Sequence, residues 1–302
     1  MKYEEYEAGC SQAQIALLGP GRAGKTTLAY SVTHLGKTLG IESEEGVHAA
    51  KDYICPENLE IELISKRVKD PKTGRMVPSL PEDEMPIGER LKELVEIAFS
   101  SPWDFVVVDS LTDIAGRFED QYARKTGSTN QQDWYKIISG MKDFVRTLKR
   151  GNFHLIATCI AAPPRDGSMI EISPALPGQL RETLLPMFQS ICLVGYNKKT
   201  KQRRLVVNDP ARGLCDRFHS YGDAQEVDIT DVPKDGIEGL ILGATARAKE
   251  IEETGTKEEV PESIPVEDHH GEPVPIPETH DGNGDPKPKA KKKVRRAQRV
   301  VT

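Results

Sequence analysis

The sequence lacks both a long hydrophobic run and a paired cysteine motif. No run of about 18 apolar residues occurs, and the N-terminal segment MKYEEYEAGCSQ has no apolar core of the kind that a secretory signal needs. The five cysteines are scattered, without a C-x-x-C motif and without the cysteine and histidine spacing of a zinc site. These absences argue against secretion and membrane spanning. They predict reduced thiols in a cytoplasmic protein.

The chain also lacks an overall positive charge. Its formal net charge is -6, so any contact with nucleic acid needs a local basic patch. Large apolar residues become scarce after about residue 250, where acids and prolines dominate until the basic segment KPKAKKKVRRAQR. Such a composition cannot bury enough surface to offset the entropy of ordering the chain. We therefore predict one domain over residues 1–249 and a disordered tail over 250–302, acidic and proline-rich first and then basic.

Strand and helix patterns alternate through the first two hundred residues. The segments AQIALL, DFVVVDSL and FHLIATCIAA are apolar runs typical of strands buried on both faces, and NLEIELISKRV (58–68) is a further strand. Helical spacing is expected over residues 25–40, 87–101, 133–150 and 175–188. The segments SICLVGYN and QRRLVVN flank KKTK as in a hairpin. The pattern predicts an α/β fold with a mostly parallel, doubly wound sheet and an antiparallel hairpin at one edge.

A complete P-loop motif follows the first predicted strand. The sequence GPGRAGKT fits G-x-x-x-x-G-K-[ST] and precedes a predicted helix, as the motif requires. Its glycines allow backbone N–H groups to converge on phosphate oxygens. Lys25 would reach the β- and γ-phosphates, and the Thr26 hydroxyl would bind Mg²⁺. The predicted nucleotide-binding residues are Gly19, Pro20, Gly21, Arg22, Ala23, Gly24, Lys25, Thr26 and Thr27.

Two acidic positions complete the predicted chemistry. Asp109 closes the apolar run WDFVVVD, where a second carboxylate near Mg²⁺ is expected; the alternative is an Asp that caps the next helix. The segment IESEEG offers Glu42, Glu44 and Glu45 as the carboxylate that orients the attacking water, or as a solvated acidic turn. We take Glu44 as the prediction, so the predicted catalytic residues are Lys25, Asp109 and Glu44.

The order of these segments resembles that of phage AAA-type nucleotide-binding proteins, including Sak-type single-strand annealing proteins. The resemblance spans about residues 13–220 and rests on LLGPGRAGKTTLA, IESEEG, WDFVVVDSLTDI, HLIATCIAAPPRDG and PALPGQLRETLLPMFQSICLVGY. It implies a RecA-like ATPase core, ATP and Mg²⁺, single-stranded DNA as ligand and self-assembly into a homo-oligomer, with a single-strand binding protein as a candidate partner. Related cores often carry His or Gln at the end of the strand LIATCI, where this chain has Thr158 and Cys159.

Basic residues supply the candidate DNA contacts. The resemblance implies that loop 163–174, which contains Arg165, faces DNA. Lys and Arg neutralise phosphates without reading sequence. The hairpin cluster could instead reach the ATP of a neighbouring subunit, as an arginine finger does. The candidates are Arg165, Lys198, Lys199, Lys201, Arg203 and Arg204.

Three functions fit these motifs. The first is a DNA-binding ATPase acting in phage recombination or strand annealing. The second is a nucleotide-gated DNA-binding or loading module with little hydrolysis. The third is a small-molecule P-loop kinase, whose lid would lie within residues 66–86.

Overall fold

The computed structural model describes most of the chain up to Ala246. The described residues are 12–43, 46–65, 67–69, 76–78, 85–126, 129–162, 173–196, 202–209, 213–216, 220–221, 225–243 and 245–246. The chain divides into two units, Met1–Thr256 and Lys257–Thr302, and every described residue belongs to the first. The tail predicted for residues 250–302 lies outside the described residues.

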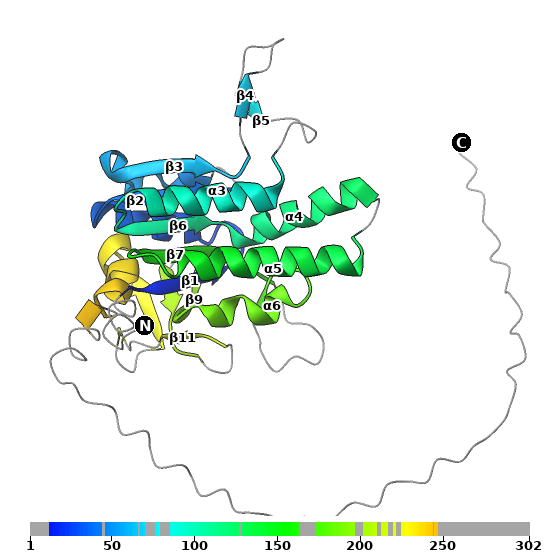
Figure 1. Ribbon diagram of the computed structural model, residues 1–302. Helices are drawn as coiled ribbons and strands as arrows, with labels where there is room; N and C mark the ends of the chain where they lie inside the picture. The colour runs from blue at the N-terminus through cyan, green and yellow to red at the C-terminus, as the bar shows by residue number, and fades with distance from the viewer. Residues whose placement is uncertain are drawn as a thin grey trace, which may run out of the picture. The chain divides into compact units, whose positions relative to one another are not determined.

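The first unit is built on one mixed sheet with the strand order β12-β10-β9-β1-β7-β6-β2-β3 (Figure 1). Six strands, β3, β2, β6, β7, β1 and β9, pair in this order as parallel neighbours. Strand β10 pairs antiparallel with both β9 and β12. Short strands β11 and β8 pair with β9 and β7. This arrangement confirms the predicted α/β fold, with a mostly parallel sheet and an antiparallel hairpin at one edge. The strands are β1 (Gln14–Gly19), β2 (Thr38–Glu42), β3 (Leu59–Leu63), β6 (Phe105–Asp109), β7 (His154–Ala162), β8 (Ser173–Pro174), β9 (Ser190–Tyr196), β10 (Arg203–Val206), β11 (Cys215–Asp216) and β12 (Glu226–Ile229).

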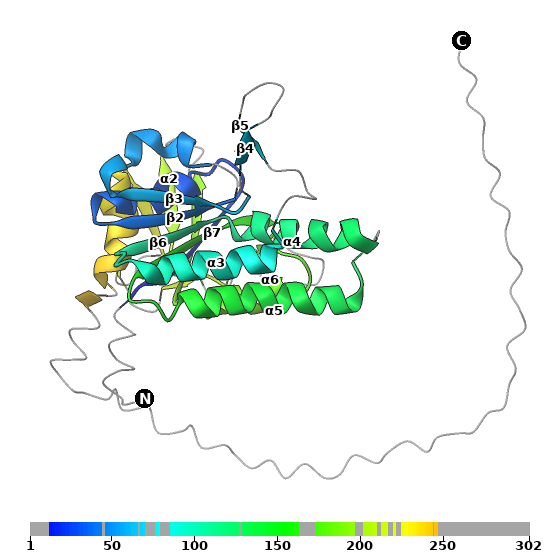
Figure 2. The same ribbon diagram turned by 45° about the horizontal axis from the view of Figure 1, so that its top comes forward.

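Helices cover both faces of this sheet (Figure 2). One face packs against α3 (Ile87–Ser100), α4 (Leu111–Thr126), α5 (Gln131–Leu148) and α6 (Leu180–Thr183). The other packs against α2 (Lys25–Tyr30) and the π-helical segment Val232–Glu238. Strand side chains alternate between the two cores: Leu18 and Val108 face the first, and Leu17 and Val107 face the second. Burial on both faces explains why these strands read as continuous apolar runs.

The helix predicted over residues 25–40 is wrong beyond its first turns. Helix α2 ends at Tyr30, a 3₁₀ turn follows over Ser31–His34, and β2 begins at Thr38. Gly40 lies in β2, against the Tyr30 ring of α2. A Cβ atom at position 40 would lie 2.6 Å from the Tyr30 hydroxyl, so only glycine lets α2 pack this closely on β2.

Other predicted boundaries also move. The strand predicted over 58–68 divides into β3 and β4 (Arg67–Lys69), and β4 pairs antiparallel with β5 (Met76–Pro78). The helix predicted over 175–188 reduces to α6 and a 3₁₀ turn, Leu185–Met187, because Pro186 has no N–H to continue a helix. Helix α5 begins after a capping box formed by Asn130 and Asp133.

Two further 3₁₀ segments, Gly46–Tyr53 and Pro56–Asn58, connect β2 to β3. Among the helices that the structure describes, none is both long and apolar enough to cross a lipid bilayer.

Candidate functional site

The P-loop lies at the carboxyl end of the sheet, between β1 and α2. Gly24 adopts a left-handed conformation (φ 95°) and forms the N-cap of α2 without a side-chain hydrogen bond. A left-handed residue at this position favours glycine, because a Cβ atom would be strained there. The strand–loop–helix context that the motif requires is therefore present.

Lys25 is held beneath this loop. Its side chain is buried, and its Nζ donates hydrogen bonds to the carbonyl oxygens of Gly19 (3.0 Å) and Pro20 (2.9 Å). A buried ammonium is costly unless polar groups solvate it, and the loop carbonyls do so here. The lysine charge is thus positioned at the mouth of the loop, where an anionic ligand would bind.

Asp109 is the last residue of β6 and is buried beside Thr26. The Thr26 hydroxyl donates to Asp109 Oδ2 at 2.6 Å, and the Thr158 hydroxyl donates to Oδ1. Thr158 comes from β7, which lies between the P-loop strand β1 and β6. Two hydroxyl donors offset the desolvation of this carboxylate. The strand in which related cores carry His or Gln therefore supplies a threonine to Asp109, while the neighbouring Cys159 is buried and its pKa is raised by burial to about 11.

Glu42 lies next to Asp109, at the end of β2. The two residues are in register on neighbouring parallel strands. Glu42 is only 1% exposed, and within the described structure neither carboxylate oxygen has a hydrogen bond of full geometry. Burial raises the pKa of Glu42 to about 7, with a further increase from the Asp109 charge; the Tyr30 hydroxyl and the amides of Gly46 and Val47 partly offset these effects. Buried oxygens without full partners can accept hydrogen bonds from a water or a bound ligand.

The backbone around these two carboxylates is fixed by hydrogen bonds. The Ser43 amide donates to the Asp109 carbonyl at 2.8 Å, and the Ser110 amide donates to the Ser43 hydroxyl at 2.8 Å. Arg117 Nη2, from α4, donates to the Ser43 carbonyl at 2.6 Å. The ends of β2 and β6 are therefore held together, which keeps Glu42 and Asp109 side by side.

These residues fit a hydrated Mg²⁺ ion bound with nucleotide phosphates. Thr26 and Asp109 present a hydroxyl and a carboxylate, and Mg²⁺ characteristically takes one or two such protein ligands while keeping water and phosphate. A Cβ atom at Gly46 would lie 3.3 Å from Thr26 Oγ1 and 3.4 Å from Asp109 Oδ2, so glycine keeps the space beside them open. No group of three His, Cys, Asp or Glu side chains in the described part of the chain could hold a metal by itself.

The remaining predicted site residues divide into two groups. Glu44, Arg165, Lys198, Lys199 and Lys201 lie outside the described residues. Arg203 and Arg204 are neighbours on β10. Arg204 Nη1 forms an ion pair with Glu226 Oε2 of β12 at 2.6 Å.

Arg203 crosses to the P-loop of its own chain. A Cβ atom at Gly24 would lie 2.8 Å from Arg203 Nε, and the guanidinium carbon lies 5.7 Å from the centre of the Tyr53 ring. The sequence motifs do not reveal this contact, because nothing in their spacing connects position 203 with position 24.

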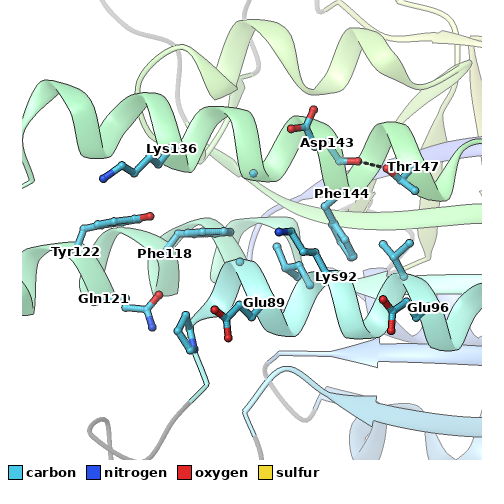
Figure 3. A pocket seen from close by; sticks show the side chains of 15 residues that line it. Glu89, Lys92, Glu96, Phe118, Gln121, Tyr122, Lys136, Asp143, Phe144 and Thr147 are labelled. Atoms are coloured by element: carbon cyan, nitrogen blue, oxygen red, sulfur yellow. Dashed lines mark hydrogen bonds between the residues drawn. The ribbon is translucent and has the colours of Figure 1, made fainter.

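A separate cavity of about 580 Å³ lies between α3, α4 and α5 (Figure 3). Phe118 and Phe144 line it together with the charged side chains of Glu89, Lys92 and Lys136. None of the predicted site residues lines this cavity. The candidate site is therefore the carboxyl end of the sheet.

Comparison with known proteins identifies the family of the chain. A family model described as an AAA domain matches residues 11–215, and the chain therefore belongs to this AAA-domain family. Among solved structures, the chain is similar to that of the RadB recombinase, with 17% sequence identity, a TM-score of 0.42 and coverage of 67% of this chain and 90% of that chain. No curated protein matches the sequence significantly.

Proposed function

We propose that this protein is a Mg²⁺-dependent ATPase that binds single-stranded DNA and acts in phage recombination or strand annealing. The observation that carries the proposal is the meeting of Lys25, Thr26, Asp109 and Glu42 at one end of the sheet. Lys25 and Thr26 come from the P-loop, Asp109 ends β6 and Glu42 ends β2. The polar contacts described above hold these residues within one site. Membership of the AAA-domain family supports nucleotide binding at this place.

Each of these residues has a distinct task in ATP hydrolysis. Lys25 binds the β- and γ-phosphates, and Thr26 and Asp109 hold the metal. When bound, Mg²⁺ offsets the negative charge of the phosphates. Glu42 takes the task that the sequence assigns to Glu44: its carboxylate accepts a hydrogen bond, and then a proton, from the attacking water. A carboxylate with a pKa of about 7 suits proton transfer near neutral pH.

Single-stranded DNA is the proposed macromolecular ligand. The support is the basic sequence around the β9–β10 hairpin, NKKTKQRR, together with Arg165. Lys and Arg clusters without a base-reading motif bind nucleic acid in a sequence-tolerant and salt-dependent way. We also propose that the chain assembles into a homo-oligomer and that a single-strand binding protein is a partner.

The test measures ATP hydrolysis by the full chain with Mg²⁺, with EDTA, and with Mg²⁺ plus single-stranded DNA at two salt concentrations. We expect turnover that needs Mg²⁺, and DNA binding that weakens steeply as salt rises. Binding of ATP and DNA with negligible turnover would support a nucleotide-gated loading module instead. Turnover that needs a small-molecule phosphate acceptor and ignores DNA would support the kinase.

A further inference from the structure

We propose that Arg203 is a phosphate ligand of the P-loop in its own chain, and that Tyr53 is the residue that positions it. This inference rests on the proposed nucleotide site and adds a cation to it from β10, which lies on the other side of β1 from the strand that carries Asp109. It differs from the arginine-finger hypothesis, in which the hairpin arginines act on a neighbouring subunit.

The first support is the close packing of the Arg203 side chain on Gly24. Three atoms of the Arg203 side chain, Nε, Cζ and Cδ, lie 2.8, 3.2 and 3.3 Å from the place where a Cβ atom of residue 24 would be. Any side chain at position 24 would displace this arginine. Gly24 therefore serves two purposes, since its left-handed backbone shapes the loop and its missing side chain admits the guanidinium.

The second support is the ring of Tyr53. It ends the 3₁₀ segment that follows β2, and the guanidinium carbon lies 5.7 Å from its centre. A cation over an aromatic face is attracted by the ring quadrupole. The ring thus holds the guanidinium beside the P-loop and leaves it partly accessible to solvent.

The third support is the anchoring of β10. Leu205 pairs with Val194 of β9 and Val227 of β12, and Arg204 forms an ion pair with Glu226. The strand that carries Arg203 is therefore fixed in the sheet. Because a guanidinium matches phosphate oxygens with two parallel hydrogen bonds, a cation fixed at this place is suited to a phosphate group entering the loop.

The experiment measures binding of Mg²⁺-ATP and of inorganic tripolyphosphate to the full chain by calorimetry. Arg203→Ala should weaken both ligands at least 10-fold, and Arg203→Lys should recover part of the loss. Tyr53→Phe should bind like the parent, whereas Tyr53→Ala should weaken binding about threefold. In an Arg203→Ala background, Tyr53→Ala should add nothing, because a positioning residue has no effect without the group it positions.

Arg146→Ala is the matched control, since Arg146 is an exposed arginine on α5, on the other face of the sheet. Unchanged tripolyphosphate affinity of a folded Arg203→Ala chain would overturn the inference while leaving the nucleotide site intact. Failure of the parent chain to bind ATP would overturn both.

A mixing experiment shows whether Arg203 acts on the P-loop of its own chain or on that of a neighbouring chain. A Lys25→Ala chain retains Arg203, and an Arg203→Ala chain retains the P-loop. If Arg203 acts within its own chain, a mixture of the two should hydrolyse no more ATP than the Arg203→Ala chain alone. Restored hydrolysis in the mixture would overturn the assignment and support an arginine finger.

Discussion

The two ends of the central sheet use their polar side chains in opposite ways. At the amino end, His154 Nδ1 accepts a hydrogen bond from the Ala13 amide at 2.9 Å, Asp104 Oδ2 accepts one from the Lys37 amide at 2.8 Å, and the His154 ring stacks on Phe105. At the carboxyl end, both oxygens of Glu42 remain without a full hydrogen bond within the described structure. The polar groups at the amino end complete the fold, whereas Glu42 at the carboxyl end retains the capacity to accept hydrogen bonds from a ligand.

The largest difference between the two ends should appear when a lysine is removed from each. Lys25→Ala should reduce ATP hydrolysis by a factor of about 1,000 or more and greatly weaken ATP binding, because it removes the charge that faces the phosphates. The exposed Lys37, before β2, is the control, and its alanine variant should keep the parent rate. Steady-state ATPase assays measure both. Parent-level turnover by a Lys25→Ala chain would place the nucleotide site elsewhere.

Replacing a glutamate should give the next largest contrast. Glu42→Gln should reduce turnover about 100-fold while ATP affinity stays within about threefold, because the amide cannot accept the proton of the attacking water. Glu60→Gln, at an exposed position of β3, is the matched control. Single-turnover hydrolysis and calorimetry separate the two effects. Full activity of Glu42→Gln would return the water-activating role to Glu44 or Glu45.

Glu42→Gln should also change how the free energy of unfolding depends on pH. Because burial raises the pKa of Glu42 to about 7, its contribution to stability is complete below about pH 4.5 and is lost as pH rises through 7. Relative to Glu42→Gln, the nucleotide-free parent should lose up to about 3 kcal/mol in free energy of unfolding between pH 5 and pH 8. Urea unfolding at the two pH values measures this, and an identical pH dependence in both chains would contradict it.

The smallest effect should come from the amino end, and in the opposite direction. Burial lowers the pKa of His154, so its contribution to stability is present above about pH 6.5 and falls as pH decreases through the lowered value. His154→Ala should cost about 1–2 kcal/mol at pH 7, from the lost hydrogen bond and the lost ring stacking, and should leave the KM for ATP unchanged. His34→Ala, at an exposed site, is the control for denaturant unfolding. A changed KM would show that the two ends are coupled.

The sequence was sufficient for the parts of the site that local pattern determines. The P-loop follows, and Asp109 ends, a strand whose apolar run is readable in the sequence, and both lie at the strand ends that the pattern predicts. Glu42 is one of three glutamates in the segment IESEEG, and only the register of β2 with β6 distinguishes it. The start of β2 was missed because Gly40 weakens its strand pattern, and its reason lies in the packing of Tyr30. The Arg203 contact joins positions that are distant in sequence, so no local pattern could reveal it.

The position of α2, the helix that follows the P-loop, depends on the size of the side chain at position 40 of β2. The Tyr30 hydroxyl occupies the space that a side chain at position 40 would need, so β2 and α2 meet there with no spare volume. Larger side chains at position 40 would push Tyr30, and with it α2, away from β2. Because α2 begins at the P-loop, such a substitution would shift the phosphate loop without contacting a ligand itself. Removing only the hydroxyl, in Tyr30→Phe, returns one oxygen's volume to the same contact. Positions 40 and 30 together thus set how closely the helix that follows the P-loop packs on its neighbouring strand.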